Sequence, residues 1–191
     1  MTRQTTLRFS PEAATALRAT SQLAQLEKAD AIRAALRLYD DLLDLVQSKF
    51  RVVVRDIAGK DRPFSPYEPF DYPASAPTRS SSGVERRSRA ADFIVSPAAT
   101  AEINRIQAKG GLKSRTDAVR AALAVYRDLL VLGACAGAKI LVRSPLGNET
   151  SIDLNFSIRE QVPNFPGAPL RPSPKPANAA TGTSASQTPH G

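Results

Sequence analysis

The sequence has few of the residues on which most enzyme chemistry depends. It contains one cysteine, one histidine, one methionine and no tryptophan. The single cysteine, Cys135, excludes a disulfide within the chain, and no histidine lies near it in the sequence to activate its thiol. The only histidine, His190, is the penultimate residue. The sequence also lacks a glycine-rich phosphate loop and a cluster of metal ligands, so we expect no enzyme activity, no cofactor and no metal.

Long apolar segments are also missing. The longest uncharged run near the middle, residues 129–138, is much shorter than the roughly 20 residues of a membrane helix. The first eleven residues are polar and lack the apolar segment of a secretory signal. Together with the single cysteine, these features predict a cytoplasmic protein without a membrane partner, associated with the nucleoid if it binds DNA.

The chain has a high net positive charge and many prolines. The formal net charge is +8, which favours a nucleic acid as partner, but the positive charge is spread evenly along the chain. A DNA-binding function must therefore depend on where particular side chains point. Most of the 15 prolines lie between Pro63 and Pro77 or beyond Pro163. We therefore expect a linker over residues 62–89 and a disordered tail over residues 159–191.

One structural unit occurs twice in this chain. Residues 30–45 match residues 117–132 at 11 of 16 positions. Shorter matches precede and follow this segment, at offsets that rise from 86 to 88, so the copies differ by single insertions between elements. The pattern predicts a duplicated unit, with copies at residues 1–61 and 90–158.

Each copy has the pattern of a strand, two helices and a hairpin, which predicts a mainly α fold with short β-strands (α+β). Ser-Pro at positions 10–11 and 96–97 is a strong signal for a helix start. The second helix carries two apolar flanks, so we expect it to pack on its own first helix and on another copy or subunit. The second hairpin alternates as far as Ile158, whereas Pro63 should disrupt the second strand of the first hairpin.

Two segments carry a resemblance to a known family. Leu112–Leu123 is similar to the second-helix signature of the ribbon-helix-helix family of MetJ/Arc-type DNA-binding proteins, and Leu7–Glu12 is similar to its strand-to-helix junction. The resemblance implies that two such strands pair antiparallel. Pairing of the strands at 4–9 and 90–95 would make the chain an intrachain pseudo-dimer, and pairing between chains stays open. In this family the resulting ribbon enters the major groove of DNA.

The resemblance also implies which side chains contact DNA. If Leu7 and Phe9 point to the core, then Gln4, Thr6 and Arg8 point outward with chemistry suited to base edges. The second strand places Ala90, Asp92 and Ile94 outward instead. Because these residues suit base contact less well, we expect the second strand to serve as a pairing partner.

Phosphate contacts are expected at the start of the second helix of each unit, where free backbone N–H groups and the helix dipole attract anions. The residues implied there are Lys28, Lys113, Ser114 and Arg115. Helix capping accounts for Ser114 equally well. In the first unit Glu27 takes the capping position, where its carboxylate would satisfy the helix end but compete with a phosphate.

These observations predict a sequence-specific regulator of transcription, in the simplest case a repressor, with double-stranded DNA as its partner. The alternative is a protein-interaction module, antitoxin-like or an assembly protein, whose DNA binding is reduced or lost. A homodimer of pseudo-dimers and a protein partner bound through the linker or tail both stay open.

Overall fold

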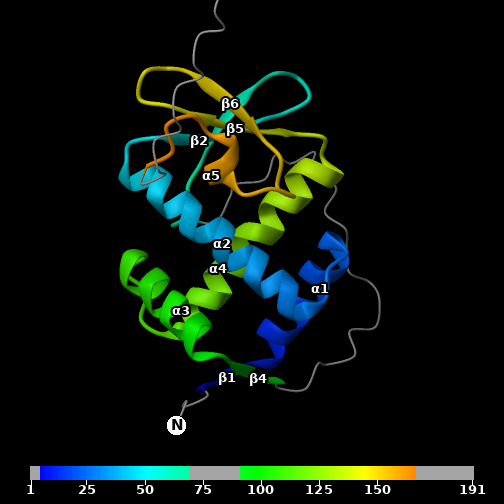
Figure 1. Ribbon diagram of the computed structural model, residues 1–191. Coiled ribbons are helices and arrows are strands. Elements are labelled where there is room, and N and C mark those ends of the chain that lie inside the picture. The colour runs from blue at the N-terminus through cyan, green and yellow to red at the C-terminus, as the bar shows by residue number, and fades with distance from the viewer. Residues whose placement is uncertain (1–4, 69–90, 167–191) are drawn as a thin grey trace, which may run out of the picture.

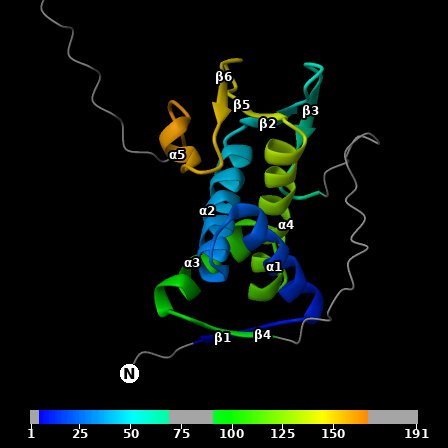
Figure 2. The same ribbon diagram turned by 90° about the vertical axis from the view of Figure 1, so that its right-hand side faces the viewer.

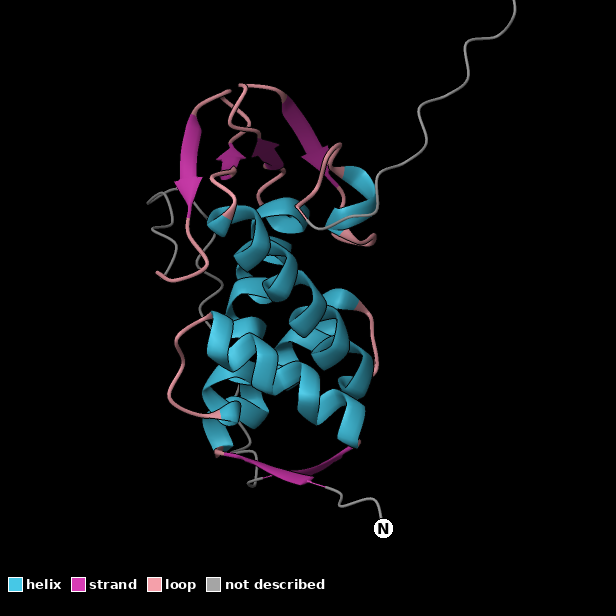
Figure 3. Ribbon diagram, turned by 60° about the vertical axis from the view of Figure 1, so that its left-hand side comes forward, coloured by secondary structure: helices cyan, strands magenta, loops and turns pink. Residues whose placement is uncertain are grey.

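The computed structural model describes residues 5–68 and 91–166. A layer of helices lies between two small antiparallel sheets, one at each end of the molecule (Figures 1 and 3). The chain is therefore a mixed α and β protein in which the helices supply the middle of the structure.

Both units follow the expected order of strand, helix, helix and hairpin. The first unit contains β1 (Thr5–Phe9), α1 (Pro11–Ala24), α2 (Lys28–Gln47), β2 (Arg51–Arg55) and β3 (Asp61–Phe64). The second contains β4 (Ala91–Val95), α3 (Pro97–Lys109), α4 (Arg115–Leu130), the π-helical turn η1 (Val131–Cys135), β5 (Lys139–Arg143), β6 (Glu149–Ile152) and the short helix α5 (Ile158–Gln161).

The predicted helix starts are confirmed. The side chain of Ser10 accepts a hydrogen bond from the backbone N–H of Ala13 (3.3 Å), and Ser96 does the same for Ala99 (3.2 Å). Proline follows each serine, where its missing N–H costs no hydrogen bond. Each cap stabilises its helix by about 1 kcal/mol.

Both sheets join the two units. β1 pairs antiparallel with β4, with Leu7 opposite Phe93, and the other sheet has the order β3-β2-β5-β6, with Val53 opposite Leu141. In each sheet, the two residues that face each other at the centre occupy the same position in the two copies of the repeat. An approximate two-fold axis therefore passes through both sheets, and the expected pairing of the first strands occurs within one chain.

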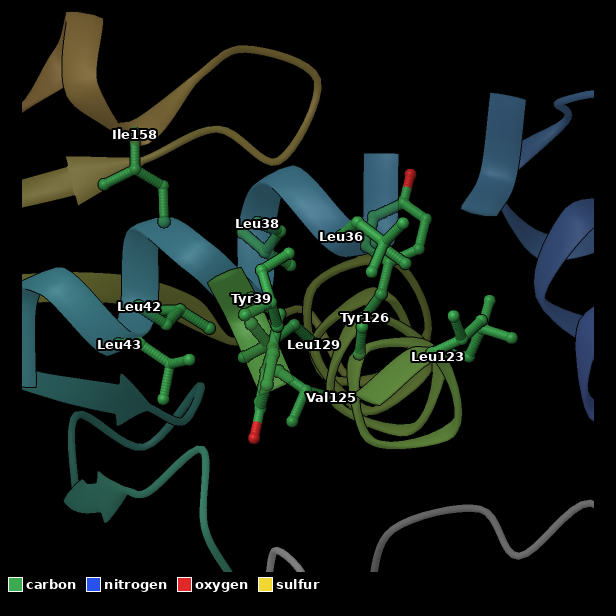
Figure 4. Packing of buried hydrophobic residues seen from close by; sticks show 14 of the residues in the cluster. Leu36, Leu38, Tyr39, Leu42, Leu43, Leu123, Val125, Tyr126, Leu129 and Ile158 are labelled. Carbon is green, nitrogen blue, oxygen red and sulfur yellow. The ribbon is translucent and has the colours of Figure 1, made fainter. Parts of the chain in front are cut away.

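The core lies between the long helices α2 and α4. Tyr39 and Tyr126, which are equivalent in the repeat, are both buried there together with leucines of both helices (Figure 4). Under the β1–β4 pair, Leu7 and Phe9 are buried, and the Phe9 ring meets the Phe93 ring edge to face at 5.1 Å. This burial fixes which face of β1 points outward.

The extra residue of the second unit is absorbed in η1. The repeat offset rises from 87 at Leu132 to 88 at Lys139, and between them the backbone N–H of Ala136 donates to the carbonyl of Val131, five residues back (3.1 Å). A π-turn accommodates one additional residue without rotating the helix before it or the strand after it. The register between β2 and β5 is therefore kept.

The expectation that Pro63 disrupts the first hairpin is wrong. Pro63 lies within β3, opposite Val53. In an antiparallel ladder, residue pairs that exchange backbone hydrogen bonds alternate with pairs that do not. The backbone N–H of Asp56 donates to the carbonyl of Lys60 (3.1 Å), and position 63 lies three pairs further along the ladder, in a pair that exchanges no hydrogen bond. Because β3 is also an edge strand, proline costs no ladder hydrogen bond here. The hairpin thus extends past residue 61, the expected end of the unit.

The strand expected to continue to Ile158 stops at Ile152. The side chain of Asp153 accepts a hydrogen bond from the backbone N–H of Asn155 (2.9 Å), a turn that ends the strand. Ile158 instead begins α5 and is buried at 2% exposure, as is Phe165 at 3%. Ordered structure therefore continues beyond the expected boundary at 158, as far as residue 166; residues 167–191 lie outside the described part.

Candidate nucleic-acid interface

The outward face of the β1–β4 ribbon carries the residues expected to contact bases. Thr6 and Arg8 are exposed, while Leu7 between them is buried. Gln4, the third residue expected there, lies outside the described residues, as does Ala90. On the opposite strand Ile94 is 72% exposed and pairs in register with Thr6.

The second helices of both units begin on the ribbon side. α2 and α4 run from the ribbon end of the molecule toward the four-stranded sheet (Figure 2). Lys28, the first residue of α2, is exposed, and so is Lys113, which precedes the cap of α4. Both lysines thus lie where a phosphate beside the ribbon would meet a helix N-terminus.

The hydroxyl of Ser114 is engaged within its own helix. It accepts from the backbone N–H of Asp117 (3.1 Å) and donates to the carboxylate of the same residue (2.7 Å). These bonds are those of a helix cap. Of the two roles left open for Ser114, they favour capping, and the Asp117 carboxylate adds a negative charge at this helix end.

Arg115 and Glu27 also lie at these helix ends. The Arg115 Nε donates to the side-chain oxygen of Asn104 in α3 (2.6 Å), so part of the guanidinium is already used within the protein. Glu27 occupies the capping position of α2 but makes no side-chain capping hydrogen bond. The expectation that its carboxylate satisfies the helix end is therefore wrong.

A cluster of charges, which the sequence analysis did not identify, joins α2 to α3 and α5. Its acidic members are Asp40 (3% exposed), Asp41 (1%) and Asp44, all on α2. Two cations of α3 contact them: Arg105 lies 2.7 Å from Asp40, and Lys109 lies 2.5 Å from Asp40 and 2.7 Å from Asp44. The third cation, Arg159 of α5, lies 2.5 Å from Asp41 and 2.7 Å from Asp44. We call these six residues the α2 charge cluster.

The part of the α2 charge cluster that joins α2 to α3 has no counterpart on the other side of the two-fold axis, although Asp41 corresponds to Asp128. The repeat equivalents of Asp40 and Asp44 are Arg127 and Val131, and those of Arg105 and Lys109 are Ala19 and Leu23. Salt bridges therefore join α2 to α3, whereas none is found between α4 and α1 among the described side chains. The sequence signal for this cluster was the acidic pair 40–41, which has apolar residues on both sides of it in the sequence.

Burial and charge act in opposite directions on the carboxyl of Asp41. Removal from water raises its pKa, and the hydrogen bond and charge of Arg159 lower it; burial is the larger effect, so the pKa lies above its usual value. The charged carboxylate therefore depends on Arg159 to remain in this position.

A second group of charges spans the four-stranded sheet at the end opposite the ribbon. Arg55 and Arg143 each bond both Asp61 and Glu149, which makes a closed square across both hairpins; the Arg55–Asp61 contact is 2.6 Å and the Arg143–Asp61 contact is 3.0 Å. The hydrogen bond from Arg55, with that from Arg143, lowers the pKa of Asp61 to about 2. We call these four residues the hairpin clasp.

No family model matches the chain, and neither curated proteins nor solved structures yield a match. In residues 5–68 and 91–166, no group of histidine, cysteine, aspartate and glutamate could hold a metal ion. Over the same residues, no helix combines the length and apolar character needed to cross a membrane.

Proposed function

We propose that this chain is a tandem ribbon-helix-helix protein that binds double-stranded DNA in a sequence-specific manner and regulates transcription, in the simplest case as a repressor. The observation that carries the proposal is the two-stranded ribbon with Leu7 and Phe9 buried beneath it and Thr6 and Arg8 exposed above it. The major groove is wide enough to admit such a ribbon. Arginine can hold guanine through two hydrogen bonds, and threonine can bond a base edge or contact a thymine methyl group.

Charge near the ribbon supports the same function. Lys28 and Lys113 are exposed at the starts of the two helices that begin on the ribbon side. Lysine at such a helix end attracts phosphate without regard to sequence. Ribbon and helix ends together would supply a specific contact and a nonspecific contact to one duplex.

The test begins with random-site selection by the full chain, followed by binding measurements over a series of salt concentrations. Arg8→Ala should cost roughly 1–3 kcal/mol of binding free energy and relax the preference at one position of the site. Lys113→Ala should weaken binding to all sequences alike and reduce the salt slope by about 1.

Two substitutions at the far end of the molecule provide matched controls. Arg51→Ala and Lys60→Ala remove the same charges from exposed residues of the first hairpin. The proposal fails if selection yields no preferred sequence, or if Arg8→Ala weakens binding no more than Arg51→Ala does. Failure to select any sequence would support the protein-interaction module instead.

A further inference from the structure

The outward face of the ribbon is chemically unequal about its two-fold axis. The axis passes between Leu7 and Phe93, so the repeat equivalent of Thr6 is Asp92 and that of Arg8 is Ile94. In a ribbon of two identical strands, both ends would carry the same pair of residues.

Here the two ends of the ribbon differ. The register places Thr6 opposite Ile94 at one end and Arg8 opposite Asp92 at the other. The first pair is uncharged and carries methyl groups, whereas the second pair consists of two charged residue types. The two pairs are separated by two residues along the strand, roughly 7 Å.

Ile94 is the residue that makes this difference informative. It is 72% exposed and occupies the outward position where its repeat equivalent is arginine. Single exposed apolar residues are common on protein surfaces and need no explanation by themselves. This one, however, lies beside Thr6 on the face proposed to enter the major groove, where the only apolar group that bases present is the methyl group of thymine.

We propose that one chain recognises a non-palindromic DNA site, in which thymine methyl groups lie against Ile94 and Thr6 and a G·C pair lies against Arg8. This inference rests on the DNA-binding function proposed above and specifies its substrate. Because the ends of the ribbon are not interchangeable, a chain binds its site in one orientation only. The second strand then takes part in recognition rather than only in pairing.

The experiment replaces thymine by uracil, one position at a time, in the site that the full chain selects. This substitution removes the C5 methyl group and leaves the hydrogen-bonding pattern of the base unchanged. For the wild-type chain we expect uracil in one half of the site to weaken binding about fourfold, the effect of one methyl group removed from contact. Sedimentation of the complex establishes that one chain occupies the site.

Ile94→Ala should weaken binding to the thymine site by several-fold and abolish the effect of uracil at one position. Arg8→Ala serves as the control, because it should weaken binding while the effect of uracil at that position persists. Ile94 is exposed, so its replacement should leave the unfolding midpoint unchanged.

Three outcomes would be decisive. A specific but palindromic site within the footprint of one chain would overturn the inference and leave DNA binding intact. An equal effect of uracil on the wild type and on Ile94→Ala would also overturn it, since the methyl group would then lie against another residue. Selection of no sequence at all would reject the proposed function itself.

Discussion

The carboxylate of Asp41 is almost completely removed from water, at 1% exposure, and Arg159 is the cation that contacts it. Burial of a carboxylate is costly unless it is paired. Its neighbour Ser157 lies at 3.4 Å and cannot replace a full positive charge. The guanidinium of Arg159 therefore offsets the cost of burying this carboxylate where α5 meets α2.

Arg159→Ala should destabilise the protein by about 3 kcal/mol, the low end of the range for a broken buried pair, because Arg159 itself is partly exposed. Urea denaturation measures the change. Since burial already raises the pKa of Asp41, loss of Arg159 should raise it further, and the variant should regain stability as the pH is lowered and the carboxyl becomes protonated.

Arg33→Ala is a suitable control, because Arg33 pairs with Asp30 on the surface, with both side chains more than half exposed. Its effect should stay below about 1 kcal/mol. Equal effects of the two substitutions would show that Asp41 does not need its partner.

Among the elements of the fold, the two hairpins are joined by the hairpin clasp, and the pKa of Asp61 gives this junction a defined dependence on pH. The folded-state pKa of about 2 lies below the ordinary value of 3.8. A lowered carboxyl pKa means that the group contributes stability above its unfolded pKa and loses it as the pH falls through the folded value. The pKa of Glu149 is also lowered, chiefly by its hydrogen bond from Arg143.

We therefore expect the free energy of unfolding to fall between about pH 4 and pH 2 as the clasp carboxylates are protonated. In Asp61→Asn this part of the pH profile should be flatter, with lower stability at neutral pH. Glu27→Gln is the matched control, since Glu27 is exposed and makes no capping bond. An unchanged slope in Asp61→Asn would contradict the role assigned to the clasp.

The elements themselves were largely predictable from sequence, but their edges and partners were not. Ser10 and Ser96 mark helix starts by local chemistry, so sequence alone was sufficient for them. The first hairpin tolerates Pro63 because β3 is an edge strand and because position 63 needs no backbone hydrogen bond to its partner. Both conditions depend on how the strands pair in the sheet, which the local sequence does not reveal. The ion pairs of Arg159 with α2 join residues more than 110 positions apart, and no local pattern predicts such contacts.

For the whole molecule, the two units share one core and both sheets, so they should unfold together. α2 packs on α4, and each sheet takes strands from both units. No described sheet or helical layer belongs to a single unit alone. Base contact and phosphate contact stay predictions at this scale, because they concern a partner rather than the fold.

Leu42→Ala and Leu129→Ala test the shared core, since these equivalent leucines are buried at 1% and 0% exposure on α2 and α4. Each should lower stability by about 2–5 kcal/mol, the cost of a cavity in a packed interior. Each should also shift a single transition. Far-UV circular dichroism and tyrosine fluorescence should report the same midpoint in both variants. Two separate transitions, with only one of them moved, would show that the units fold independently.

The unequal charges on either side of the two-fold axis also bear on the history of the chain. A symmetric dimer of one short protein acquires every substitution twice, once on each side of its axis. Acidic residues of α2 form salt bridges with basic residues of α3, while the equivalent positions on α4 and α1 do not carry acidic residues opposite basic ones. One-sided divergence of this kind is open only to copies encoded separately. The difference between the two sides at these positions therefore arose after the duplication, when each half could adapt to the other rather than to itself.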